Sequence, residues 1–218
     1  MEKDFVYVKE FQLGSVDKRE VLRYLGGKDW DEKTDILFEE CINECSGVIR
    51  CKTCFSLYEL SHKIIKEFCG SSKILEKNLT GCKKIILFSA TIGYGIDSLI
   101  MKYTSVSPIK ALMFQAIGTE RVEQLCDKLC AYLKGEFGNI LPRFSPGYGD
   151  FSLEYQKDIF RLLDCYKNIG LSLNDSLLMS PSKSVTAIVG VSEKCSGDIA
   201  HKCYECDKND CIFRRDIK

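Results

Sequence analysis

The sequence predicts an α+β fold with a mostly antiparallel sheet. Helical and strand-like segments interleave irregularly along the chain instead of alternating, which favours this class over a doubly wound parallel sheet. The clearest strand is the apolar run at 83–92, and the longest helical pattern covers 109–133. With 218 residues, 45% of them hydrophobic, the chain can bury roughly 70% of its extended-chain surface in a core.

The N-terminal part of the chain contains two predicted helices between strand-like segments. Val21, Leu22 and Leu25 share one helical face, and Gly26-Gly27 follows as a stop. Residues 48–60 are rich in β-branched and aromatic side chains, which indicates one strand or a strand pair. In order, we expect a strand at 5–8, helices at 16–25 and 31–45, and strand structure at 48–60, with 61–68 left undecided.

The C-terminal part begins with the strand at 83–92. Gly93 and Gly95 then allow a sharp turn, and Asp97 is placed to start a helix. Pro108 is expected to interrupt the chain before the long helix, whose polar side carries Glu120, Glu123 and Asp127. The remaining expected elements are a turn-rich loop at 142–150, a helix at 153–169 ended by Gly170, and a strand at 185–191.

Charge and composition exclude several classes of function. Thirty-one basic residues balance 31 acidic ones, so the chain has no overall field to hold nucleic acid or acidic lipid. The apolar runs fall short of the roughly 20 residues that span a bilayer, and the first four residues do not resemble a signal peptide. We therefore expect a cytoplasmic protein whose 13 cysteines stay reduced.

The loop around Arg143 combines residue types that suit a zwitterionic ligand with an aromatic group. Arg143 can hold a carboxylate bidentately, and Pro146 adds rigidity. The backbone at Gly147 can approach a ligand closely, and Tyr148 offers an aromatic face. From the residues alone, the alternative is an arginine that pins a surface loop.

The motif Arg-x-x-x-Gly-Tyr, from Arg143 to Tyr148, resembles the S-adenosylmethionine-binding motif of the activation (reactivation) domain of cobalamin-dependent methionine synthase. Downstream, 171–176 followed by Met179, Pro181 and 184–185 is similar to another segment of that family. Upstream, Ala116 with Glu123 and Asp127 is similar to its ligand-binding helix. The resemblance is best over 109–191, within a predicted domain of residues 1–192.

The resemblance implies a C-shaped single domain, with a central twisted antiparallel sheet flanked by helices, that binds S-adenosylmethionine. Arg143 would bind the methionyl carboxylate, and Pro146, Gly147 and Tyr148 would shape the pocket. Glu123 would receive the ligand's ammonium or lie beside its cationic end. Taken alone, Glu123 is interpreted as a solvated helix carboxylate, and this interpretation is kept for Asp127 and Glu120.

The resemblance also implies partners. In that family a methyl group from S-adenosylmethionine and one electron, from a donor such as a flavodoxin or ferredoxin, restore methylcobalamin from cob(II)alamin. Here the cobalamin would sit on a separate corrinoid-binding protein or truncated methionine synthase. The chain would be a methyltransferase component, because it is too short to be a complete methionine synthase.

One departure from the family opens a second interpretation. The family supplies a further tyrosine after the last strand, and residues 190–194 contain none. The alternative is therefore a noncatalytic docking module for a corrinoid protein.

The segment 193–218 has the composition of a metal-binding tail. Cys203 and Cys206 form a Cys-x2-Cys pair, and Cys211 and Cys195 supply third and fourth soft ligands, with His201 as an alternative fourth. Zinc, an iron–sulfur cluster and no metal at all remain open. An iron–sulfur cluster would favour a third interpretation, an electron-transfer accessory protein.

Overall fold

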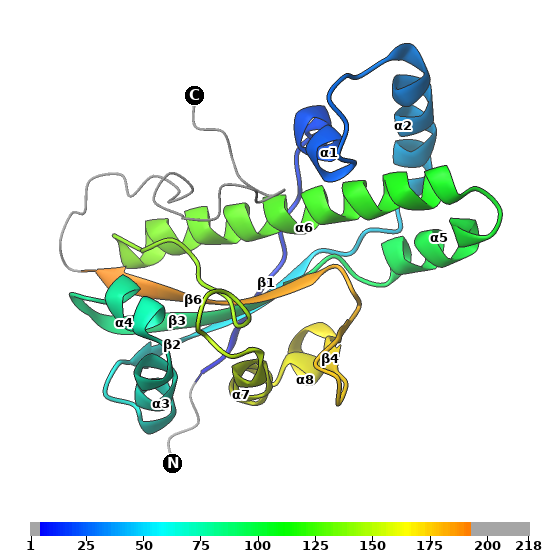
Figure 1. Cartoon of the computed structure of the whole chain (residues 1–218). Coiled ribbons are helices and arrows are strands. Elements are labelled where there is room, and N and C mark those ends of the chain that lie inside the picture. The colour runs from blue at the N-terminus through cyan, green and yellow to red at the C-terminus, as the bar shows by residue number, and fades with distance from the viewer. Residues whose placement is uncertain (1–4, 193–218) are drawn as a thin grey trace.

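The computed structural model describes residues 5–192, which form a four-stranded antiparallel sheet with helices on both faces (Figure 1). The strand order is β1 (Tyr7–Lys9), β2 (Lys52–Glu59), β3 (Cys82–Thr91) and β6 (Ser184–Ser192). Every neighbouring pair is antiparallel. A second, two-stranded sheet pairs β4 (Ser172–Leu173) with β5 (Met179–Ser180). The predicted α+β class with an antiparallel sheet is confirmed.

The long helix α6 (Pro108–Phe137) lies along one face of the sheet (Figure 1). Pro108 opens this helix, because a first-turn residue needs no intrahelical N–H donor. The other helices are α1 (Lys18–Tyr24), α2 (Glu32–Cys45), α3 (Lys63–Ser71), α4 (Lys73–Asn78), α5 (Gly95–Thr104), α7 (Gln156–Leu163) and α8 (Cys165–Ile169). None of these helices combines the length and apolar character needed to cross a bilayer.

Carboxylates begin the first two helices. Asp17 accepts hydrogen bonds from the backbone N–H groups of Arg19 and Glu20, and Asp31 accepts one from Thr34. Such N-caps satisfy N–H groups that have no partner within the helix. They explain why the predicted helices at 16–25 and 31–45 form close to their expected positions.

The predicted single helix at 153–169 was wrong. The structure has a short 3-10 helix (Leu153–Tyr155), then α7, then α8, with Asp164 in the left-handed region at φ 44° between them. The side chain of Asn168 donates to the carbonyl of Leu163 at 2.7 Å and so satisfies a group freed by the break. The undecided segment 61–68 became part of α3, and α4 was not expected.

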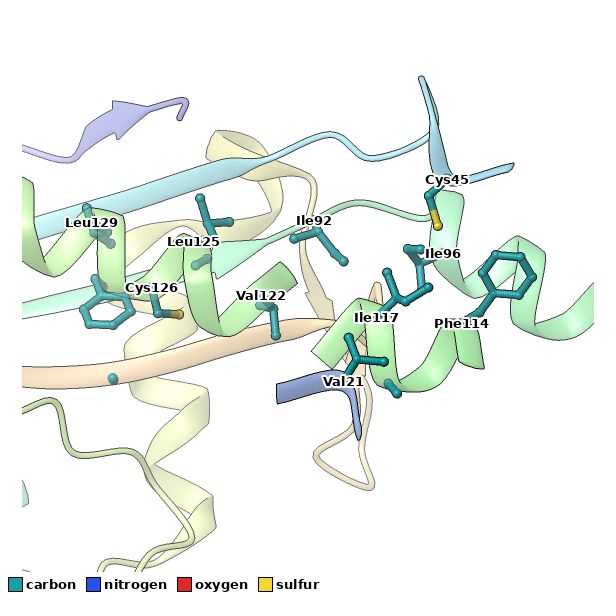
Figure 2. Close-up of a cluster of buried hydrophobic side chains, with 14 of the residues drawn as sticks. Val21, Cys45, Ile92, Ile96, Phe114, Ile117, Val122, Leu125, Cys126 and Leu129 are labelled. Atoms are coloured by element: carbon teal, nitrogen blue, oxygen red, sulfur yellow. The ribbon is translucent and has the colours of Figure 1, made fainter. Parts of the chain in front are cut away.

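Side chains of β3 alternate between two cores. Ile86, Phe88 and Ala90 face α6, whereas Ile85 and Leu87 face α7 and α8. The first core is the larger, and Figure 2 labels ten of its residues: Val21, Cys45, Ile92, Ile96, Phe114, Ile117, Val122, Leu125, Cys126 and Leu129. Because both faces are covered, β3 reads as a continuous apolar run rather than as alternating polarity.

Candidate functional site

The loop that carries Arg143 is attached to the outer edge of β6. Phe144 and Ile188 exchange two backbone hydrogen bonds, with N–O distances of 2.9 and 2.8 Å. Further along the same edge, the N–H of Leu141 donates to the carbonyl of Gly190 at 2.8 Å. These bonds hold the start of the loop in register with the sheet, so the position of Arg143 is set by β6.

The loop turns tightly after Arg143. Pro146 is buried, and Gly147 has φ +91°, a backbone conformation that costs glycine little. The N–H of Gly147 donates to the carbonyl of Phe151, and the N–H of Tyr148 donates to that of Ser145. The side chain of Tyr148 is 67% exposed at the tip of this turn. The predicted ordered loop is therefore present, with its aromatic residue accessible.

Two contacts that the sequence did not indicate anchor the far end of the loop. The ring of Phe151 is buried and stacks on Tyr155, with centroids 5.2 Å apart. Asp150 accepts hydrogen bonds from the Ser72 hydroxyl at 2.5 Å and from the backbone N–H of Lys73 at 2.8 Å, at the start of α4. The loop is thus held at both ends, by the sheet and by α4.

Arg143 lies between two carboxylates of α6. Its guanidinium donates to Glu123 Oε2 and to Asp127 Oδ1, each at 2.5 Å. Residues four apart on a helix share one face, which explains why both carboxylates reach the same cation. The structure brings the predicted pair Arg143 and Glu123 together. It also adds Asp127, which we had interpreted as a solvated helix residue, and the four-residue spacing was the sequence feature that could have indicated it.

This cluster carries one cation and two carboxylates. Burial acts to lower the pKa of Arg143, but the neighbouring Cys126 and the carboxylates of Asp127 and Glu123 outweigh burial, and the pKa is raised. Burial raises the pKa of the Cys130 thiol, and the charge of Arg143 and its hydrogen bond with the thiol oppose that shift. The guanidinium is therefore permanently charged, and the cluster keeps an excess negative charge that suits a cationic ligand.

Glu120 does not belong to this cluster, although the helical pattern placed it on the same polar side. Its side chain is buried, where its Oε2 accepts a hydrogen bond from Arg121 at 2.6 Å and its Oε1 one from the N–H of Asp17 at 3.2 Å. The hydrogen bond from Asp17 fastens the segment before α1 to α6. Glu120 is therefore a buried structural residue, and its predicted role as a solvated helix carboxylate was wrong, because the segment before α1 packs over this part of α6.

A cavity of about 440 Å³ lies beside this cluster. Four of the five predicted ligand-binding residues line it, namely Glu123, Arg143, Pro146 and Tyr148, and Gly147 lies between two of them. The rest of its wall comes from Pro142, Phe144 and Ser145 of the same loop, from the first residues of β6, from Met179, and from Leu153 and Gln156 near the start of α7. Residues distant in sequence therefore form one site, large enough for part of a nucleoside-sized ligand.

A larger cavity of about 690 Å³ lies between residues 10–13 and 49–52. Its buried cation, Arg121, already donates to Glu120 and to the backbone carbonyls of Gly14 and Ser15. Arg121 is therefore committed to holding the N-terminal segment. Because Arg121 is already paired and the other two cations of the wall, Arg50 and Lys52, are exposed, this cavity is a weaker candidate for a ligand despite its size.

Comparison with known proteins identifies the fold. No protein-family model and no curated protein matches the chain. A solved structure does match, the crystal structure of the MetH reactivation domain bound to AdoHcy, with a TM-score of 0.62 and 13% sequence identity over 90% of this chain and 81% of that chain. The chain has a fold similar to that of the MetH reactivation domain. The expected resemblance to the activation domain of cobalamin-dependent methionine synthase is thereby confirmed in fold.

The predicted metal ligands Cys195, Cys203, Cys206 and Cys211, with His201, lie outside the described residues. Among the side chains that the structure describes, no group of three or more His, Cys, Asp or Glu residues is arranged to hold a metal ion. The metal-binding tail stays a prediction.

Proposed function

We propose that the chain binds S-adenosylmethionine (AdoMet) in the cavity beside β6 and acts as a reactivation protein for a corrinoid held by a separate protein. The position of Arg143 carries this proposal. A loop anchored to the sheet holds this cation at the wall of a cavity. There it contacts Glu123 of α6, the residue to which the family resemblance gives a role in ligand binding. The similarity in fold to a domain solved with AdoHcy, the demethylated product of AdoMet, supports the same ligand class.

Each residue has a distinct proposed role. The guanidinium of Arg143 has five N–H donors and uses two on Glu123 and Asp127, so others can bind the methionyl carboxylate. Glu123 contacts Arg143 through Oε2, and we assign its Oε1 to the ligand's ammonium. Pro146, Gly147 and Tyr148 shape the open side of the cavity. The sulfonium is then held by position and charge rather than by a covalent bond.

The proposed task of the protein is to position the methyl group. AdoMet supplies the methyl cation equivalent, the corrinoid on the partner supplies the accepting cobalt, and an electron donor such as a flavodoxin or ferredoxin supplies the electron. The chain's own residues orient the ligand and shield it from water. A corrinoid-binding protein or truncated methionine synthase, in the cytoplasm, is the proposed partner.

Calorimetric titration of the purified chain with AdoMet and AdoHcy tests the proposal. We expect binding of both, and Arg143→Ala should weaken it by about 1.5–3 kcal/mol because charged hydrogen bonds to the carboxylate are lost. Arg161→Ala is the matched control, since Arg161 pairs with Asp158 on α7 and does not contribute to the cavity wall. Unchanged binding in Arg143→Ala, or none in the folded wild type, would contradict the assignment.

A noncatalytic docking module is the second candidate. It is favoured by the occupation of Arg143 by two carboxylates and by the lack of a tyrosine at 190–192, where the family has one. This candidate predicts no measurable AdoMet binding by the chain alone, together with stable association with a corrinoid-loaded protein. Analytical ultracentrifugation with and without AdoMet separates the two candidates. The reactivation protein should carry AdoMet into the complex with the corrinoid-loaded protein, whereas the docking module should form that complex without AdoMet.

The third candidate, an electron-transfer accessory protein, depends on the cysteines of residues 193–218. Metal analysis of anaerobically purified protein tests it. Iron and sulfide in equal amounts with visible charge-transfer absorbance would support it, and stoichiometric zinc would instead indicate a structural site.

A further inference from the structure

Gln156, at the start of α7, has a buried hydrogen-bond acceptor without a partner. The residue is 3% exposed, and no group in the described chain donates to its Oε1. Buried polar atoms are nearly always paired, since an unpaired acceptor has lost its water without compensation. Gln156 also lines the cavity beside Arg143. Because a residue of the cavity wall carries this unpartnered acceptor, a ligand in the cavity can supply the missing donor once the carboxamide turns toward it.

Gln156 and the charged cluster reach the cavity from helices on opposite faces of the sheet. Glu123 is on α6, which covers one face of the sheet, and α7 covers the other (Figure 1). The cavity passes the edge of the sheet at residues 184–186 and so extends from one helix to the other. A ligand whose amino-acid end binds Arg143 therefore presents its remote end to Gln156.

The wall around Gln156 suits a flat base. Leu153 and Met179 line the same cavity and offer apolar contact to a ring. A glutamine carboxamide matches adenine in two places, because Oε1 accepts from the exocyclic amine and the NH2 group donates to ring nitrogen N7. Hypoxanthine has acceptors at both positions, so it can form only one of these bonds.

We infer that Gln156 is the specificity-determining residue of the cavity and that its Oε1 accepts a hydrogen bond from the exocyclic amine of an adenine base. The inference rests on the proposed function, because it assumes that the amino-acid end of the ligand binds Arg143. It names the part of the ligand that this chain recognises, the adenine base, and the residue that recognises it, Gln156.

Titration with AdoHcy and with its deaminated analogue S-inosylhomocysteine tests the inference. The wild type should bind the adenosyl compound about tenfold more tightly, the value of one well-placed hydrogen bond. Gln156→Met has a similar volume and no amide, so it should bring the two affinities within about threefold. Gln115→Met, at an exposed position of α6, is the matched control and should keep the wild-type preference.

The melting temperature of the free protein gives an independent readout. Gln156→Met removes an unpaired acceptor, so its melting temperature without ligand should equal or exceed that of the wild type. A clearly lower value would show that the amide stabilises the free chain, and would overturn the inference.

The outcomes for the wild type separate this inference from the proposed function. Equal affinity for the adenosyl and inosyl compounds would overturn the role of Gln156 and leave AdoMet binding intact. A retained preference in Gln156→Met would do the same. Binding of neither compound would overturn both proposals.

Discussion

Phe144 and Ile188 form a two-residue extension of the sheet beyond β6, through hydrogen bonds in both directions between their backbones. Arg143 immediately precedes this contact, so its backbone is as firmly placed as an edge strand. The guanidinium then crosses to α6 and meets Glu123 and Asp127. A cation on a rigid element, facing carboxylates on a second rigid element, is a preorganised arrangement that needs little rearrangement on ligand binding.

Asp127→Asn should change which ligand the site prefers. The substitution removes one of two carboxylates that favour the sulfonium charge of AdoMet over neutral AdoHcy. Asp127 is 56% exposed in its side chain, so solvent screening limits the effect, and we expect the AdoMet-to-AdoHcy affinity ratio to fall about threefold. Asp158→Asn on α7 should leave the ratio unchanged. A ratio that stays constant or rises in Asp127→Asn would show that the carboxylate does not sense the ligand's charge.

Gly147→Ala should weaken AdoMet binding about five- to tenfold. At φ +91° an alanine is strained by about 1 kcal/mol, and its Cβ would lie 3.3 Å from Leu153 Cδ1, so the Leu153 side chain in the cavity wall must move slightly. Gly138→Ala is the control, because Gly138 has φ +80° and open space around its Cβ. An alanine at this position has a similar backbone strain, but it lies outside the cavity wall. Equal loss of binding in both variants would mean that overall stability, not the loop, is responsible.

Gly95→Ala should lower the free energy of unfolding by about 2–3 kcal/mol. A Cβ on Gly95 would lie 2.2 Å from the backbone oxygen of Val48, and backbone cannot move aside as a side chain can. Gly135→Ala on α6 meets nothing within 4 Å and should instead stabilise the chain by about 0.5–1 kcal/mol. Urea denaturation measures both. A mild effect of Gly95→Ala would mean that the close approach of the two segments is not required for folding.

Asp150 should make stability depend on pH in the acidic range. The hydrogen bond from Ser72 and the N–H groups of Lys73 and Ile74 hold the pKa of Asp150 below its usual value. A carboxyl with a lowered folded-state pKa stabilises the fold above its unfolded pKa of roughly 4, and this contribution is lost as the pH falls through the folded value. Asp150→Ala should therefore melt below the wild type at pH 7, and the difference should vanish near pH 2. Asp175→Ala, at an exposed position, should show no such convergence.

Local sequence pattern predicted the elements whose signals are strong over many residues. The apolar run at 83–92 and the helical spacing at 109–133 became β3 and α6, because continuous burial on both faces and a 3.6-residue period each leave a clear record in sequence. The predicted helix at 153–169 is divided into a 3-10 helix, α7 and α8. Its apolar spacing continues across Asp164, where the backbone takes the left-handed conformation, so the periodicity does not record the break.

The sequence by itself determined the chemistry of the loop, because Arg143, Gly147 and Tyr148 have properties that do not depend on their neighbours: a permanent charge, a permissive backbone and an aromatic face. Only the tertiary structure decided which residues face them. Asp127 became a partner of Arg143 because α6 packs beside β6, and Gln156 lost its hydrogen-bond partner because α7 packs over the other face. Pairing and desolvation are properties of groups brought together across long stretches of chain, and a local pattern does not contain them.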